Sequence, residues 1–130
     1  MKILILEDDE NRIATFMEKL PTWQDVTCVT TAEAAIEKLS TEEFAVVFLD
    51  HDLGGEVYVD PSNPNTGSGV VRWMLQNVET VQDPDIVIHS MNTPAALAME
   101  QDLKGKYGFV WRIPFPTLVT NYLNDPSFLR

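Results

Sequence analysis

The sequence has little of several residue types, and each scarcity excludes a class of protein. Cys28 is the only cysteine among 130 residues, so no internal disulfide can form and we expect a cytoplasmic protein. The 9 basic side chains are outnumbered by 20 acidic ones, for a formal net charge of −11. Such a charge repels polyanions, so we expect no extended nucleic-acid surface, although a small phosphorylated ligand in one pocket is not excluded.

Long apolar runs are missing as well. The run ILIL near the N-terminus is ended by acidic residues, and it is too short for a signal peptide or a membrane span. We therefore expect no membrane partner.

What the sequence does contain is an alternation of apolar strands and amphipathic helices. Continuous apolar or β-branched runs, typical of strands covered on both faces, occur at 2–7, 25–30, 45–50, 85–90 and 108–113. Apolar spacing, capping signals and prolines predict helices at 10–20, from a Thr30 cap to about 40, from about 67, from a Thr93 cap, and at about 116–123.

This alternation predicts an α/β fold with one domain over residues 1–130. We expect a three-layer sandwich, in which a five-stranded parallel sheet in the order 2-1-3-4-5 carries helices on both faces. Ligands bind such sheets beyond the carboxyl ends of the strands.

Polar side chains follow the predicted strands at those ends. They are Glu7, Asp8 and Asp9 after the first strand, Asp50, His51 and Asp52 after the third, His89, Ser90 and Asn92 around the end of the fourth, and Arg112 in the fifth. The first, third and fourth strands are neighbours in the predicted order, about 4.8 Å apart. We therefore expect these side chains to meet on one rim.

The segments KILILEDDENR, FLDHDLGG and RIPF, with the polar end of the fourth strand, resemble the response-regulator receiver domain. The resemblance covers nearly the whole chain. In that family an acidic pair and the aspartate after the third strand bind magnesium, and the aspartate accepts a phosphoryl group. By position, the resemblance implies Glu7 and Asp8 as the acidic pair and Asp50 as the phosphoacceptor.

Three departures from that family are visible. His89 stands where the family has Ser or Thr, Arg112-Ile113-Pro114 replaces its Lys-Pro, and an inserted loop lies at about 54–66. With them the chain looks like a divergent branch, the cyclic-phosphate processing receiver family, which has Asp-His-Asp, His-Ser-x-Asn and an arginine in these places. The resemblance implies activity on a cyclic phosphate.

The acidic residues favour a divalent metal. Glu7, Asp8, Asp50 and Asp52, crowded on one rim, would repel each other unless a cation binds or some take up protons. Carboxylate oxygens suit Mg²⁺, Mn²⁺ or Ca²⁺, and an added histidine favours Mn²⁺ or Zn²⁺. We expect these residues to be metal ligands, with Mg²⁺ or Mn²⁺ as the first choice.

The histidines favour proton transfer. Histidine titrates near neutral pH, so His51 and His89 are candidates for general base and general acid beside Asp50. Arg112 offers a bidentate fork for phosphate oxygens. Together these four residues are the predicted catalytic group of a phosphodiester hydrolase that opens a cyclic phosphate.

Other residues are candidates for substrate binding. The helix start TGSG would supply free amides of Gly67 and Ser68 and a positive dipole end beside the rim. Ser90 and Asn92 would contact the substrate with Arg112, or would only cap the turn into the next helix.

Structural explanations stay open for several of these residues. Asp9 is expected to cap the first helix, and His51 could be hydrogen-bonded at the strand end. Side chains alternate along a strand, so Asp50 and Asp52 could share a face that His51 does not. The inserted loop is either a lid, with Tyr58 as a contact, or a tolerated insertion, and its segment EVYV predicts a short strand.

Three function classes therefore remain. The first is a metal-assisted phosphoesterase acting on a cyclic nucleotide or an RNA cyclic-phosphate end. The second is a phosphoacceptor receiver that signals through partner proteins by way of Asp50. The third is a binding module without chemistry, since one fold hosts several roles.

Overall fold

A computed structural model describes residues 1–21 and 24–123 of the chain. Its centre is one parallel sheet in the order β2-β1-β3-β4-β5. The strands are β1 (Lys2–Leu6), β2 (Asp25–Val29), β3 (Val46–Leu49), β4 (Asp85–Ile88) and β5 (Val110–Arg112). The predicted α/β class and strand order are confirmed.

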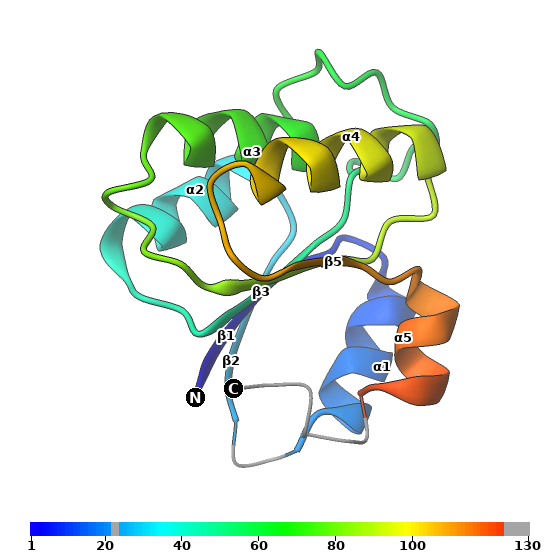
Figure 1. Cartoon of the computed structure of the whole chain (residues 1–130). Helices are drawn as coiled ribbons and strands as arrows, with labels where there is room; N and C mark the ends of the chain where they lie inside the picture. The colour runs from blue at the N-terminus through cyan, green and yellow to red at the C-terminus, as the bar shows by residue number, and fades with distance from the viewer. Residues whose placement is uncertain (22–23, 124–130) are drawn as a thin grey trace.

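Helices cover both faces of the sheet. They are α1 (Glu10–Lys19), α2 (Ala32–Thr41), α3 (Gly67–Gln76), α4 (Thr93–Lys104) and α5 (Phe115–Asn121). Helices α1 and α5 lie on one face, and α2, α3 and α4 lie on the other (Figure 1). Within residues 1–21 and 24–123, no helix is long and apolar enough to cross a membrane.

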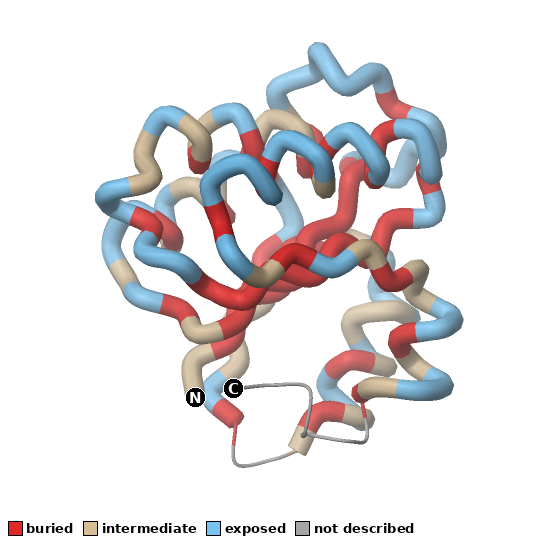
Figure 2. The backbone as a smooth tube through the Cα atoms, in the orientation of Figure 1, coloured by how far each residue is buried: buried red, intermediate tan, exposed pale blue. Residues whose placement is uncertain are grey.

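The alternation of strand side chains divides the core into two clusters. Leu6, Leu49 and Ile88 belong to the cluster on the side of α2, α3 and α4. Phe48, one residue before Leu49, belongs to the cluster that contains Phe16 of α1. Because both faces are covered, the central strands β1, β3 and β4 are almost entirely buried, while the edge strands β2 and β5 and the outer helix faces are more exposed (Figure 2).

Some local predictions are wrong. Helix α2 is capped by Thr31 rather than Thr30, since the Thr31 hydroxyl accepts the amide of Ala34. Helix α4 is capped by Asn92 rather than Thr93. The segment EVYV forms no strand, because no neighbouring strand pairs with it. The Asp9 cap of α1 is confirmed by its hydrogen bonds to the amides of Asn11 and Arg12.

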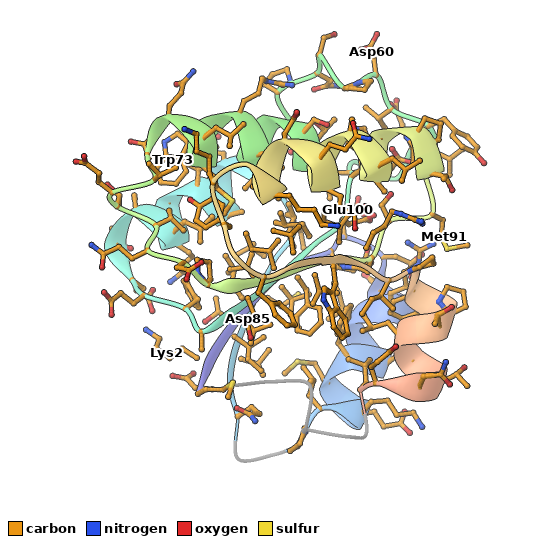
Figure 3. All side chains as sticks on the ribbon, viewed as in Figure 1. Lys2, Asp60, Trp73, Asp85, Met91 and Glu100 are labelled. Atoms are coloured by element: carbon orange, nitrogen blue, oxygen red, sulfur yellow. The ribbon has the colours of Figure 1, made fainter. Side chains whose placement is uncertain are left out.

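The inserted loop, residues 54–66, projects beyond α3 and α4 at the carboxyl end of the strands. Figure 3 labels Asp60 on this loop and Met91 just after β4, whereas Lys2 and Asp85 lie at the starts of β1 and β4. The carboxyl end of the sheet is therefore the end that carries Met91 and the inserted loop.

Candidate functional site

Strand register brings three polar side chains together. Leu6 of β1 pairs with Leu49 of β3, and Leu49 pairs with Ile88 of β4. The residues that directly follow these three paired positions are Glu7, Asp50 and His89, so they lie side by side. The pairing continues into these residues, since the amide of Asp50 donates to Leu6 O and that of His89 to Leu49 O.

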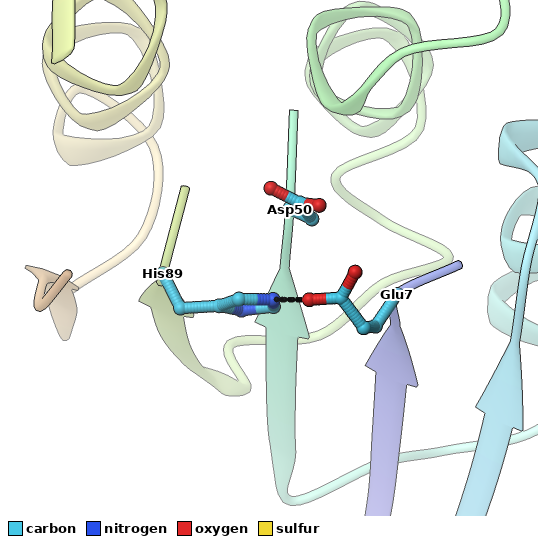
Figure 4. Close-up of side chains that lie close together, drawn as sticks. All are labelled: Glu7, Asp50 and His89. Atoms are coloured by element: carbon cyan, nitrogen blue, oxygen red, sulfur yellow. Dashed lines mark hydrogen bonds and ion pairs between the residues drawn. The ribbon is translucent and has the colours of Figure 1, made fainter. Parts of the chain in front are cut away.

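Glu7, Asp50 and His89 form a compact group, called the acidic–histidine cluster below. One potential ligand atom from each lies within 4.8 Å of the other two. His89 Nε2 donates a hydrogen bond of 3.1 Å to Glu7 Oε1 across the end of β3, with Asp50 beside the pair (Figure 4). All three side chains are buried.

His89 is also held by aromatic packing. Its ring lies 5.2 Å from that of Phe16 in an edge-on arrangement and 6.2 Å from that of Phe115. These contacts place His89 on the α1 and α5 side of the sheet. Its orientation toward Glu7 is therefore set by the core.

The two carboxyls of the cluster differ in proton affinity. Burial raises the pKa of Asp50 to about 7, and the nearby Glu7 charge adds to this while His89 and Arg12 oppose it. Burial also acts to raise the pKa of Glu7, but the hydrogen bond and electrostatic attraction of His89 outweigh it and leave that pKa lowered. Near neutral pH, Glu7 is ionised and Asp50 is partly protonated, so a cation would compete with a proton for Asp50.

Glu7 and Asp50 contribute to the wall of a cavity of about 350 Å³ at the end of the sheet. The wall is completed by the β1–α1 turn, α1, the inserted loop and the segment after β4. The lining residues are Glu7, Asp8, Asp9, Arg12, Asp50, Asp52, Gly55, Glu56, Val57, Tyr58, Ser90, Met91 and Asn92. Six of them are acidic, and among these lining residues Arg12 is the one that carries a positive charge.

The family model of the cyclic-phosphate processing receiver domain matches residues 2–105. The chain belongs to this family. The matched range contains the whole acidic–histidine cluster, the inserted loop and every cavity-lining residue. No curated protein matches the chain significantly.

Several solved structures of other proteins share the fold. The Mn²⁺-bound form of the response regulator Rcp1 has a TM-score of 0.70 at 16% identity, covering 98% of this chain and 92% of that one. A CheY-like receiver domain from Methylobacillus flagellatus has a TM-score of 0.63 at 18% identity, with 98% and 95% covered. An adenylate cyclase from Rhodopirellula baltica has a TM-score of 0.60 at 18% identity, with 87% and 76% covered.

Two predicted metal ligands of this receiver domain also hold the inserted loop. Asp8 Oδ2 accepts the amide of Gly55 at 2.9 Å. Asp52 accepts the amides of Tyr58 and Val59 at 2.7 and 3.1 Å. Asp8 and Asp52 are not part of the acidic–histidine cluster. The structure therefore groups Glu7 and Asp50, two of the four predicted metal ligands, with His89.

The inserted loop is tied to the domain at further points. Gly54 and Gly55 have φ of +79° and +76°, a conformation that glycine adopts without strain. Arg72 of α3 donates to the carbonyl of Pro61 at 2.7 Å, and the amide of Ala32 donates to Asn65 Oδ1 at 3.0 Å. Arg72 thus supports the loop, and residues 55–58 of the loop form a wall of the cavity.

The structure does not present the two histidines as a pair to the cavity. His51 is fully buried, and its Nδ1 lies 2.7 Å from Asp52 Oδ1 and 3.4 Å from Asn92 Nδ2. His89 belongs to the acidic–histidine cluster. Neither ring lines the cavity, which argues against the predicted general-base and general-acid pair and favours the structural alternative for His51.

Ser90 and Asn92 do line the cavity, and they also shape the turn into α4. Ser90 Oγ accepts the Asn92 amide at 3.0 Å. Asn92 Oδ1 accepts the Ala95 amide, and its Nδ2 donates to Asp52 Oδ1 at 3.1 Å. Ser90 and Asn92 therefore make the turn and cap contacts expected of the structural alternative, and they also line the cavity.

Three predicted phosphate ligands lie outside the cavity wall. The Gly67 amide donates to His51 O, so it is not available to a substrate, and Ser68 follows it in α3. Arg112 of β5 pairs with Ile88 of β4. Because β4 lies between β3 and β5, Arg112 is two strand spacings, about 10 Å, from β3. Its Nε is buried and has no hydrogen-bond partner among the described residues.

Arg12 was missed by sequence reasoning. It lies in the first turn of α1, with Nη1 at 3.7 Å from Glu7 Oε1 and 3.9 Å from Asp50 Oδ2. A basic residue in the first turn of a helix opposes the helix dipole. That unfavourable position, five residues after Glu7, is the sequence signal that could have pointed to it.

Proposed function

We propose that this receiver domain is a metal-dependent phosphoesterase that hydrolyses a cyclic phosphate. The observation that carries the proposal is the acidic–histidine cluster, whose potential ligand atoms lie within 4.8 Å of one another beside the cavity. Two carboxylates and an imidazole fit a divalent cation, and the mixed oxygen and nitrogen set favours Mn²⁺ over Mg²⁺. The Mn²⁺-bound form of Rcp1, a protein of the same fold, supports testing Mn²⁺ first.

The charge of the cavity supports a cation on independent grounds. Six acidic residues and one arginine line it, so an anionic phosphate would be repelled by the protein alone. A divalent cation held by Glu7, Asp50 and His89 would neutralise the two carboxylates that hold it, polarise a phosphoryl oxygen and lower the pKa of a bound water.

The chain's own residues would position the substrate. Ser90 Oγ accepts the Asn92 amide, and its hydroxyl proton can be donated to a phosphate oxygen. Asn92 is held by Asp52 and by its capping contact, so the Ser90 turn is rigid. Preorganised donors of this kind lose little entropy when substrate binds.

The cavity suits a small phosphorylated ligand with a flat apolar part. Val57, Tyr58 and Met91 line it and are 78%, 75% and 48% exposed. An exposed aromatic ring with apolar neighbours offers a stacking surface for a nucleobase. We infer a cyclic nucleotide or an RNA cyclic-phosphate end as substrate, with no extended nucleic-acid contact and no membrane partner. We place the protein in the cytoplasm.

The test is hydrolysis of a panel of cyclic nucleotides and RNA cyclic-phosphate ends with Mn²⁺, Mg²⁺ or chelator. The two histidines supply matched variants. His89→Gln should lower turnover by about 100-fold or more, because a ligand of the cation is lost. His51→Gln should keep turnover within about tenfold of wild type, since His51 acts through the loop contacts alone.

Turnover that survives chelation, or equal loss in both variants, would contradict the proposal. A second candidate, phosphorylation of Asp50 with signalling through partner proteins, is favoured by the place of Asp50 in the cavity wall at the end of β3. Incubation with acetyl phosphate and Mg²⁺, followed by intact-mass measurement of wild type and Asp50→Asn, would detect it.

A further inference from the structure

Arg12 is held beside the acidic–histidine cluster without being hydrogen-bonded to it. Its Nη1 lies 3.7 Å from Glu7 Oε1 and 3.9 Å from Asp50 Oδ2, and both distances exceed those of a hydrogen bond. The guanidinium makes no side-chain hydrogen bond with any other residue in the described part of the chain. Its donors are therefore available to a ligand in the cavity that it lines.

The position of Arg12 is set by packing as well as by charge. The guanidinium carbon lies 5.5 Å from the centre of the Phe115 ring, within the range of a cation–π contact. The Arg12 amide donates to Asp9, which fixes the first turn of α1. Its side chain is one-third exposed, so the guanidinium can move without disturbing the core.

A cation in the acidic–histidine cluster would act on this guanidinium. Glu7 and Asp50 now attract Arg12, and a divalent charge between them would cancel that attraction, since it balances the charge of the two carboxylates. The available direction is the cavity, because Phe115 lies against the guanidinium on another side. The planar fork of arginine would then meet the phosphate oxygens of a substrate in the same cavity.

We propose that Arg12 is the phosphate-binding residue of this cavity, and that a divalent cation in the acidic–histidine cluster releases it for that role. The proposal rests on the metal-dependent function above and deepens it, since it gives an order in which the cation binds before the phosphate. It also assigns to α1 the role that sequence reasoning gave to Arg112.

The test uses Mn²⁺ alone and inorganic phosphate as probes, with isothermal titration calorimetry. Wild type should bind phosphate at least about tenfold more tightly in saturating Mn²⁺ than in chelator. Arg12→Gln should bind Mn²⁺ several-fold more tightly, because a positive charge near the cluster is removed, yet bind phosphate about tenfold or more weakly in Mn²⁺.

Two further variants separate charge, geometry and folding. Arg12→Lys keeps the charge but not the fork, so its Mn²⁺ affinity should match that of wild type while its phosphate affinity falls. Lys19→Gln removes a positive charge at the other end of α1, and it should leave both affinities unchanged.

The outcomes also distinguish this inference from the proposed function. Phosphate binding by Arg12→Gln at the wild-type level in Mn²⁺, or weaker Mn²⁺ binding by that variant, would overturn the role of Arg12 even if cyclic phosphates are hydrolysed. Wild type that binds no Mn²⁺ would overturn the release by a cation. If Arg12→Gln binds Mn²⁺ more tightly and phosphate more weakly, while wild type hydrolyses no cyclic phosphate, the phosphate-binding role of Arg12 would be supported and the phosphoesterase function refuted.

Discussion

Replacement of Asp50 by asparagine tests the electrostatics of the site in the metal-free protein. Burial raises the pKa of Asp50 to about 7 from its ordinary value of 3.8. The folded state therefore binds the proton more tightly than the unfolded state does, and Asp50 destabilises the fold increasingly as pH rises from 3.8 toward 7. Asparagine has a similar shape and no charge, so Asp50→Asn escapes this penalty.

The size of the effect follows from the pKa. Between about pH 5.5 and pH 7 the penalty grows by about 1.36 kcal/mol per pH unit, roughly 2 kcal/mol in all, and it is constant above pH 7. The stability of Asp50→Asn relative to wild type should thus increase by roughly 2 kcal/mol between pH 5.5 and pH 8. Groups that titrate equally in both proteins cancel in this comparison.

The measurement is urea unfolding in chelator, followed by tryptophan fluorescence at both pH values. Asp102→Asn is the control, because Asp102 is exposed on α4, and its difference from wild type should not depend on pH. Addition of Mn²⁺ at pH 8 should stabilise wild type and not Asp50→Asn. If the free energies of unfolding of Asp50→Asn and wild type differ by the same amount at both pH values, the raised pKa of buried Asp50 would be refuted.

Two other variants test the framework of the site. Asp52→Ala removes the carboxylate that accepts the amides of Tyr58 and Val59. It should lower the free energy of unfolding, measured in urea, by about 2–4 kcal/mol. Its Mn²⁺ affinity, measured by calorimetry, should stay within about threefold of wild type. Loss of Mn²⁺ binding would instead make Asp52 a ligand. Gly67→Ala would bring a Cβ into overlap with the Asp50 carbonyl oxygen, costing at least about 2 kcal/mol. The control Gly105→Ala, whose Cβ would meet Asp102 O at 3.6 Å, should change stability by less than about 1 kcal/mol; equal costs would contradict the close packing at Gly67.

Much of the site could be predicted because strand ends are visible in a sequence. Apolar runs locate the ends of β1, β3 and β4, and parallel pairing brings those ends to one edge. Glu7 and Asp50 were expected there for that reason, and the structure places them in one cluster with His89. The role of Asp9 as a cap was equally local, since it depends on residues two and three positions away.

The partners of Asp8, Asp52 and His51 could not be predicted in the same way. Asp8 accepts an amide 47 residues away in sequence, and His51 contacts Asn92 across 41 residues. A carboxylate beside a strand end can bind a metal or a loop amide, and composition does not distinguish them. Arg12 was missed because its importance comes from its position beside Glu7 and Asp50 in the cavity wall, which only the tertiary structure shows.

The sequence by itself determined the fold class and the rim on which polar groups gather, because apolar periodicity marks the strands and parallel strands bring their carboxyl ends to one edge. The strand order was expected as a common order for five parallel strands, and the structure confirms it. The tertiary structure decided which of those groups face one another. Register and side-chain alternation joined His89 to Glu7, while His51, two residues past β3, packed with Asp52 and Asn92. Only the packing of α1 against the sheet placed Arg12 beside the cluster, since that contact depends on distances between elements rather than on residue spacing.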